Sequence, residues 1–228
     1  MTQRSSKTGV TTVAKIARAA EAAGRAAADI EVQPDGRKRR SQSSQRRIVA
    51  ALLELVGEGH VTPSAEQVAE RAGVGLRSVF RHFKDMDSLY REMSGSIAAT
   101  LEDAVRQPFA AADWRGQALE LIDRRAATFE KLGPYLRASQ VHRHRSAFLR
   151  AGHARFVQVL REFLLDRLPA DENLAPDMVE AIDMMLSFEA WQRLRHDQGL
   201  DVSRAKRVLK ASVGVILERG KAPARIQR

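Results

Sequence analysis

Apolar residues between positions 48 and 56 recur every three or four positions, a spacing that places them on one face of an α-helix. They are Ile48, Ala51, Leu52, Leu55 and Val56. We expect this helix to begin near Ser44 and to end at Gly57 and Gly59. A further helix is expected from about Asp85, with Leu89, Met93 and Ile97 along one side.

Two shorter helices are predicted between these, over residues 65–72 and 76–83. Ser64 is well placed to cap the first, and Gln67 three positions later completes an S-x-x-Q capping box. Gly73 ends that helix at a position where a positive φ is commonly needed, and Gly75 opens the second helix. Together the two helices have the layout of a helix-turn-helix.

Residues 98–219 indicate helices only, because no alternating apolar and polar run suggests a strand. Proline and glycine separate the predicted segments. One helix is expected to end at Gly133-Pro134, and a pair over residues 135–149 and 152–168 is expected to pack around Gly152. A long helix is predicted from Pro176 to Gly199, and Asp201 is expected to cap the last one. The predicted fold class is therefore all-α.

The helix-turn-helix carries the strongest functional signal. Val79 and Phe83 lie four positions apart and face the interior, which leaves the neighbouring residues outside. Residues 68–83, VAERAGVGLRSVFRHF, resemble the DNA-binding domain of the tetracycline-repressor (TetR) family, and the resemblance continues to Asp87, Leu89 and Tyr90. It implies an N-terminal three-helix DNA-binding domain followed by a larger helical ligand-binding and dimerisation domain. The alternative is a helical hairpin that packs on a protein partner.

Several positions depart from the family pattern. Gly75 replaces the usual Ser or Thr cap, and Phe80 replaces a tyrosine whose hydroxyl could reach a phosphate. Met86 stands where a lysine is frequent, and we expect Lys84 to replace one lost phosphate contact. Arg77 stands where many members carry a small residue, and arginine is the commonest reader of guanine in the major groove.

The predicted DNA-binding residues divide by role. Leu76 and Arg77 are expected on base edges, and the phosphate contacts are expected from Ser64, Ser78, His82 and Lys84. Phe80 and Arg81 complete the predicted surface. His82 could equally be an ordinary surface histidine.

The formal charge of +10 is unevenly distributed. Residues 1–47 hold eleven Lys or Arg against four acids, whereas residues 48–95 hold five against seven. DNA affinity would therefore depend on a few placed residues and on the basic segment that precedes the helix-turn-helix. Its cations are Arg37, Lys38, Arg39, Arg40, Arg46 and Arg47. We expect this segment to enter the minor groove, to add non-specific attraction, or simply to be solvated.

The predicted organisation has four segments. Residues 1–43 form a flexible basic extension, in which the alanine-rich stretch 12–30 has helix propensity. Pro34 and Gly36 are expected to keep residues 33–47 out of regular structure. Residues 44–95 form the DNA-binding domain, residues 96–220 the ligand-binding and dimerisation domain, and residues 221–228 a tail.

The resemblance implies a small-molecule pocket within residues 96–220 and a homodimer formed through the two C-terminal helices. The candidate pocket residues are Phe109, Trp114, Phe129, Phe148, Phe156, Met185, Phe188 and Trp191. Aromatic and methionine residues at helical spacing are core more often than pocket lining. Because few acids face this region, an apolar or aromatic effector is expected.

Other chemistries are disfavoured. The chain contains no cysteine, which excludes disulfides and fits a reducing cytoplasm. No apolar run approaches the roughly 20 residues of a membrane span, so a soluble, cytoplasmic protein is expected. His142 and His144 would point about 200° apart on a helix, and with His153 they predict no metal site. No catalytic motif is recognisable, so neither enzymatic activity nor a cofactor is predicted.

These observations predict a ligand-responsive transcriptional regulator, most simply a repressor that binds a palindromic operator in double-stranded DNA as a homodimer. Ligand would favour a spacing of the two DNA-binding domains that does not fit the operator. One alternative is an architectural DNA-binding protein without a ligand. Another is a helical lipid- or small-molecule-binding protein, or an enzyme, that keeps the helix-turn-helix as a scaffold.

Overall fold

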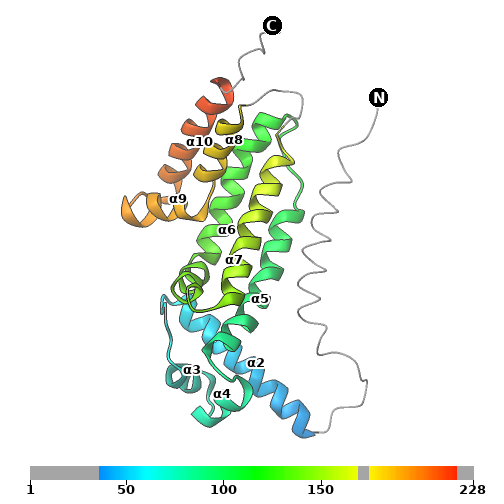
Figure 1. Ribbon diagram of the computed structural model, residues 1–228, viewed down its shortest axis with the longest axis vertical. Helices are drawn as coiled ribbons and strands as arrows, with labels where there is room; N and C mark the ends of the chain where they lie inside the picture. Colours follow the sequence, from blue (N-terminus) through cyan, green and yellow to red (C-terminus); the bar gives the residue numbers. More distant parts are fainter. Residues whose placement is uncertain (1–35, 169–174, 220–228) are drawn as a thin grey trace. The chain divides into compact units, whose positions relative to one another are not determined.

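Helices form all the regular structure in the part of the chain that the computed structural model describes, residues 36–168 and 175–219 (Figure 1). Side chains are described throughout this part except at residues 36–38, 96–105 and 219. The predicted all-α fold class is confirmed over these residues. The predictions for the stretch 12–30 and for the tail 221–228 fall outside them.

Packing divides these residues into two compact units. The head unit consists of residues 36–106 and 132–153, and the body unit consists of residues 107–131 and 154–219. These packing units do not coincide with the boundary expected between residues 95 and 96. That boundary concerned DNA-binding and ligand-binding domains, and it stays a prediction.

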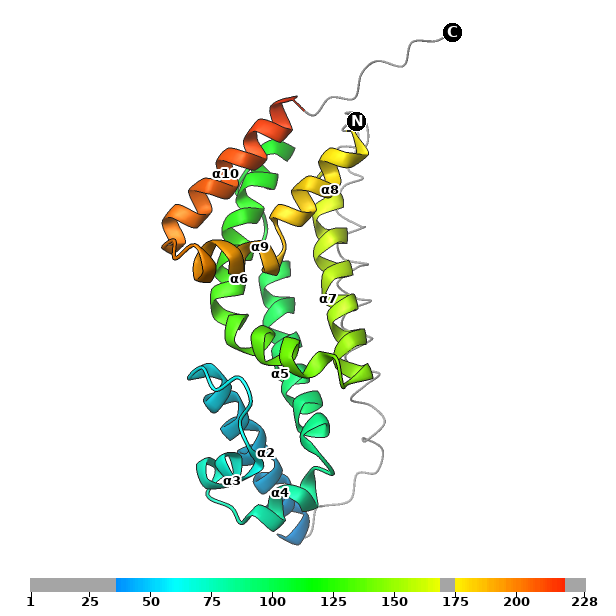
Figure 2. The same ribbon diagram turned by 60° about the vertical axis from the view of Figure 1, so that its left-hand side comes forward.

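The head unit begins with α2 (Gly36–Gly57), α3 (Ala65–Ala72), α4 (Leu76–His82) and α5 (Met86–Arg106). Helices α3 and α4 pack against α2 (Figures 1 and 2). The apolar face predicted for the first helix is buried, with Ile48 and Leu52 fully inaccessible to solvent. Val79 of α4 and Phe83 close the same core, as the four-residue spacing predicted.

The start of α2 corrects a prediction. The helix begins at Gly36 and not near Ser44, so residues 36–43 are helical and not part of a linker. Residues 37–47 contain neither proline nor glycine, and Arg, Lys and Gln are good helix formers. Pro34 precedes the helix and therefore does not interrupt it.

The turn between α3 and α4 is built as predicted. Ser64 Oγ accepts a hydrogen bond from the backbone N–H of Gln67 (3.3 Å), and the Ser64 N–H donates to Gln67 Oε1 (2.9 Å), which completes the capping box. Gly73 has φ 62°, in the left-handed region, and its N–H donates to the carbonyls of the last turn of α3. Gly75 caps α4 with extended backbone and no side-chain hydrogen bond.

Helices α6 (Trp114–Arg143) and α7 (Ala147–Leu165) contribute to both units. Ala138 of α6 and Leu149 of α7 are buried in the head core. The ring of His142 stacks on that of Tyr90 at 4.4 Å between centroids, and the Arg91 guanidinium lies 5.0 Å from the centre of the Phe148 ring. The core beneath the helix-turn-helix therefore depends on residues far along the chain.

The break between α6 and α7 corrects two predictions. Helix α6 continues through Gly133-Pro134, because a proline inside a helix can be accommodated by a bend. The chain instead turns at residues 144–146, where Ser146 Oγ accepts from the Leu149 N–H (3.1 Å) and caps α7. Arg150 Nη1 donates to the carbonyl of His144 (3.0 Å), at the end of α6. Gly152 therefore lies inside α7, not at a turn.

The body unit contains the first half of α6, most of α7, α8 (Pro176–Met185), α9 (Phe188–Gln192), the π-helix η2 (Arg193–Asp197) and α10 (Val202–Arg219). Lys206 and Lys210 of α10 both contact the Asp123 carboxylate on α6, at 2.8 and 2.6 Å. Helix α10 accordingly runs beside α6 in both views (Figures 1 and 2).

The predicted helix from Pro176 to Gly199 is divided in the structure. Helix α8 ends at Met185, and Ser187 caps α9 by accepting from the Ala190 N–H (3.1 Å). Serine is a strong N-cap residue, and its position within an apolar run concealed this break. The two ends are confirmed: Pro176 is the first residue of α8, and Gly199 has φ 64°. None of the described helices has the length and apolar character needed to span a bilayer.

The stacked pair of Tyr90 and His142 predicts a pH dependence of stability. Burial is the largest cause that lowers the His142 pKa below 6.5, the positive groups of His144 and Arg145 lower it further, and Asp87 opposes them. The unfolded chain therefore binds this proton more readily, so the stabilisation is present above pH 6.5 and is lost as the pH falls below it.

We expect the Tm of the wild-type protein to fall between about pH 7.5 and pH 5 by more than that of a His142→Phe variant, which keeps a ring on Tyr90. His60→Gln, at an exposed histidine outside this contact, is the control, and its Tm should fall as that of the wild type does. Equal losses of Tm in all three proteins would contradict the assignment.

Candidate nucleic-acid interface

Helix α4 presents a mixed apolar and basic face to solvent. On its inner side Val79 is buried, and so is Phe83, the residue that follows the helix. On the outer side Leu76 is 37% exposed and Phe80 is 52% exposed, an unusual exposure for an aromatic side chain. Arg77 and Arg81 are exposed beside them. The structure thus exposes together the residues predicted to read bases.

The described ion pairs of the head unit lie on α2, α3 and α5 and on the residue that follows α2. Arg71 bridges Glu58 (2.7 Å) and Glu54 (3.6 Å), which ties α3 to α2. Arg91 pairs with Asp87 one turn away. Among the described residues, no carboxylate pairs with the three cations of α4 and its C-terminal end: Arg77, Arg81 and Lys84. The carboxylates of Glu54, Glu58 and Asp87 are therefore paired with cations outside α4.

The residues predicted to contact phosphates differ in whether their polar groups already form hydrogen bonds within the protein. Ser64 Oγ accepts the capping hydrogen bond, and its hydroxyl also interacts with Glu66. The Glu66 backbone N–H and then this hydroxyl lower the pKa of the Glu66 carboxyl, which therefore stays charged beside the serine. Ser78 Oγ accepts from Arg81 Nη2 at 3.4 Å. Lys84 is exposed, and so is the more available contact.

His82 is half-buried, and its Nε2 is buried without a hydrogen-bond partner in the described part of the chain. Burial, and then the charge of Arg81, lower the pKa of this imidazole. His82 would therefore meet a phosphate as a neutral donor and not as a cation.

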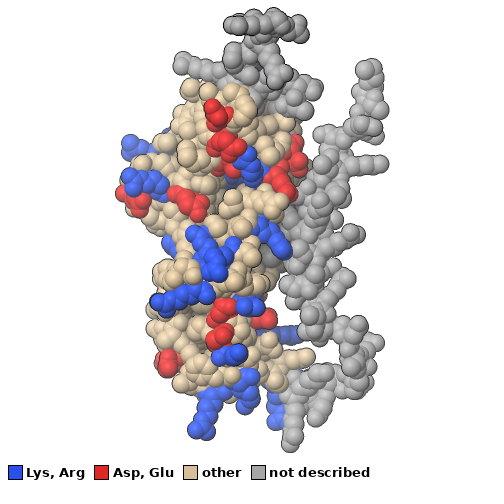
Figure 3. All heavy atoms as spheres, viewed as in Figure 1, with Lys and Arg blue, Asp and Glu red and all other residues tan. Residues whose placement is uncertain are grey.

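The basic segment ahead of the helix-turn-helix lies on α2 and not in a flexible arm. Arg39 and Arg46 are seven positions apart, as are Arg40 and Arg47, so each pair lies on one side of the helix. All four side chains are exposed. Basic side chains gather at the lower end of the view in Figure 3, where Figure 1 has α4 and the first turns of α2. The side chains of Arg37 and Lys38 are outside the description.

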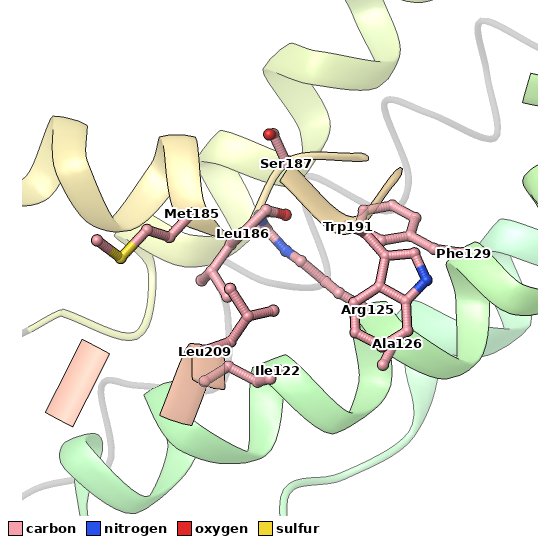
Figure 4. A pocket seen from close by; sticks show the side chains of 9 residues that line it. All are labelled: Ile122, Arg125, Ala126, Phe129, Met185, Leu186, Ser187, Trp191 and Leu209. Carbon is pink, nitrogen blue, oxygen red and sulfur yellow. The ribbon is translucent and has the colours of Figure 1, made fainter. Parts of the chain in front are cut away.

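The body unit contains a second candidate site, a cavity of about 10 Å³ (Figure 4). Its lining residues are Ile122, Arg125, Ala126, Phe129, Met185, Leu186, Ser187, Trp191 and Leu209. A space of this size holds one water-sized sphere, far below the several hundred Å³ of a typical ligand pocket.

Three of the eight predicted ligand residues, Phe129, Met185 and Trp191, line this cavity. Phe188 packs edge-on against Phe129 at 5.4 Å between ring centroids.

The other four lie elsewhere. Phe109 stacks near Phe163, Trp114 lies under the guanidinium of Arg115, Phe148 belongs to the head unit, and Phe156 is half-buried on α7. Their contact with a ligand remains a prediction.

Arg125 was missed by the sequence analysis. It lies four residues before Phe129 on the apolar face of α6, where a charged residue is rare unless it is paired. An arginine on this apolar face was therefore the feature of the sequence that could have identified the site.

Residues of α8, α9, η2 and α10 line an open groove of about 360 Å³. Met184 is 65% exposed and Val208 is 40% exposed, and both line it. Val215, further along α10, is 51% exposed. In the described part of the chain no three His, Asp or Glu side chains come together as metal ligands would.

No family model matches the sequence, and no curated protein matches it. Among solved structures, the chain is similar to a crystal structure assigned as a TetR-family transcriptional regulator from Mesorhizobium loti MAFF303099. The two are 19% identical with a TM-score of 0.56, and the match covers 80% of this chain and 99% of that one.

A TetR transcriptional regulator from Rhodococcus sp. RHA1 is 15% identical, with a TM-score of 0.45 and coverage of 76% and 97%. This second similarity is too low to add to the argument. The first establishes the fold: the described chain is an all-helical protein with a helix-turn-helix. Its fold is that of the TetR family, as the resemblance predicted.

Proposed function

We propose that this protein is a sequence-specific DNA-binding transcriptional regulator, a repressor that binds as a dimer and is released by a small ligand. One observation carries the proposal: the recognition helix α4 exposes Leu76 and Phe80 beside cations that have no carboxylate partner among the described residues. Unpaired cations favour phosphates and guanine, whereas exposed apolar side chains suit the thymine methyl group. The exposed arginines of α2 add sequence-independent attraction.

The specificity part of the proposal can be tested by selecting target sites from random DNA and footprinting the best one. A regulator protects two symmetric half-sites, whereas an architectural protein retards all fragments equally. Arg77→Ala should cost about 1–3 kcal/mol on the selected site and relax base preference at one position of each half-site. Arg155→Ala, at an exposed arginine of α7, is the matched control and should change neither. Unaltered preference in Arg77→Ala would remove this residue from base recognition.

The apolar part of α4 makes a separate prediction. Replacing thymine by deoxyuridine removes only the C5 methyl group, and we expect this to cost about 0.8 kcal/mol for each methyl that α4 contacts. A Phe80→Ala variant should bind more weakly but lose its sensitivity to the replacement at one thymine. Val61→Ala, at an exposed apolar residue outside α4, should retain it. Equal sensitivity in all three proteins would exclude a contact between Phe80 and thymine.

Dimerisation is proposed through α8 and α10, because Met184, Val208 and Val215 expose apolar side chains there. The double variant Met184→Glu, Val208→Glu should sediment as a monomer and bind a single half-site, since charges at the centre of an interface are strongly unfavourable. Val157→Glu, at an exposed valine on α7, should remain a dimer. A double variant that stays dimeric would place the interface elsewhere.

A further inference from the structure

Arg125 is the one charged side chain that is buried in the described part of the chain, with 4% of its surface exposed. Isolated buried charges are strongly disfavoured and are normally paired with an opposite charge. The partners of this guanidinium therefore indicate what the position is for.

The guanidinium has only neutral hydrogen-bond partners. Its Nη1 donates to the backbone carbonyl of Leu186 (2.7 Å), and its Nη2 donates to the carbonyl of Leu160 on α7. Its Nε is buried and has no hydrogen-bond partner among the described residues. Asp183 acts on the guanidinium through its charge but makes its own contact with Arg161 at 3.1 Å.

The protein thus keeps a cation in an environment that opposes charge. Burial, the largest cause, lowers the Arg125 pKa to about 10, although the charge of Asp183 opposes this change. The side chain remains positive at neutral pH, so an anion that reached it would find a charge that water no longer screens.

The surroundings of this cation are apolar. The cavity that Arg125 lines is otherwise formed mainly by aliphatic, methionine and aromatic side chains, with Ser187 as a second polar member (Figure 4). Ser187 Oγ is engaged by the Ala190 N–H, and Trp191 Nε1 donates to Glu130. Among the polar side chains of this cavity, the guanidinium therefore has the donor best placed to anchor a ligand.

One wall of this small cavity is adaptable. Met185 and Leu209 line both the cavity and the open groove between α8 and α10. Methionine is unbranched and changes rotamer at low cost. A change of the Met185 rotamer is therefore the step by which the cavity would open toward the groove.

We propose that this site binds a small apolar carboxylic acid, with its carboxylate on the Arg125 guanidinium and its hydrocarbon or aryl part beside Phe129, Met185 and Trp191. The assignment of this acid as the effector rests on the proposed regulatory function, whereas its binding does not. The carboxylate accepts from Nε–H and from the N–H groups that the two carbonyls leave free. A neutral ligand of the same shape leaves the charge uncompensated.

The test compares acids with their own amides on the wild-type full-length chain, by thermal shift and calorimetry. The probes are octanoate against octanamide, and 4-phenylbutyrate against 4-phenylbutanamide. We expect at least one acid to raise the Tm and to bind roughly tenfold or more tightly than its amide, because only the acid supplies an opposite charge. Equal binding of acid and amide, or no binding of either acid, would overturn the proposal.

Arg125→Met separates this role from a purely structural one. The variant keeps an unbranched apolar side chain and removes the buried charge, so it should fold, lose the preference for acid over amide, and unfold at the wild-type Tm or above it. Arg124→Met is the matched control on the same helix, since Arg124 pairs with Glu120 outside the cavity. It should keep the acid preference. An acid preference that survives in Arg125→Met would overturn the proposal.

If Arg125→Met does not fold, Arg125→Lys decides the question, because lysine keeps the charge but not the fork of donors. A Kd for the acid that rises roughly tenfold supports the site, and an unchanged Kd overturns it. These measurements contain no DNA. Failure of acid binding therefore leaves the footprinting result intact, and failure of DNA binding leaves the acid site intact.

Discussion

The burial of Val79 and Phe83 against α2 is the constraint on which the exposed face of α4, the proposed DNA-binding surface, depends. Helix α4 has only seven residues, too few to be stable alone, so its position comes from packing. Once these two side chains point inward, helical geometry directs Leu76, Arg77 and Phe80 outward. The same core contains Tyr90 on α5 and Ala138 on α6, so the placement of α4 is shared with helices that are distant in sequence.

In the head unit, the positions of the charged side chains matter more than the net charge. The segment 48–95 holds more acids than cations, and total charge alone would argue against DNA binding. The arrangement is compatible with the proposed binding, because Glu54 and Glu58 pair with Arg71 at the contact between α2 and α3. Exposed pairs of this kind contribute little stability. Their effect on the proposed DNA binding would be to compensate carboxylates that repel phosphates.

Local rules predicted the turn between α3 and α4 better than the ends of the longer helices. The capping box at Ser64 and the positive φ of Gly73 follow from residues within four positions of each other, so the sequence contained the whole cause. Proline and glycine were less reliable as markers of helix ends. Gly133-Pro134 lies inside α6, and Gly36 lies at the start of α2.

The candidate sites divide in the same way. The outward residues of α4 follow from helical spacing, whereas the partners of Arg125 are carbonyls of Leu160 and Leu186, far away in sequence. No local pattern predicts that two backbone oxygens and no carboxylate will meet a guanidinium. Residue type alone suggested an apolar ligand for this region, and the missing counter-charge is visible only in three dimensions.

Helix α6 gives the two sites a physical connection. Its first half carries Arg125 in the body unit, and its last turns carry Ala138 and His142 in the head core. The division between the units falls between Lys131 and Leu132, one residue before Gly133-Pro134, where α6 lacks a backbone donor and so resists bending less than elsewhere. A ligand can bias DNA binding only if its contacts differ between two states of some shared element. Because α6 contributes side chains to both cores, it is the shared element through which the proposed ligand would have to act.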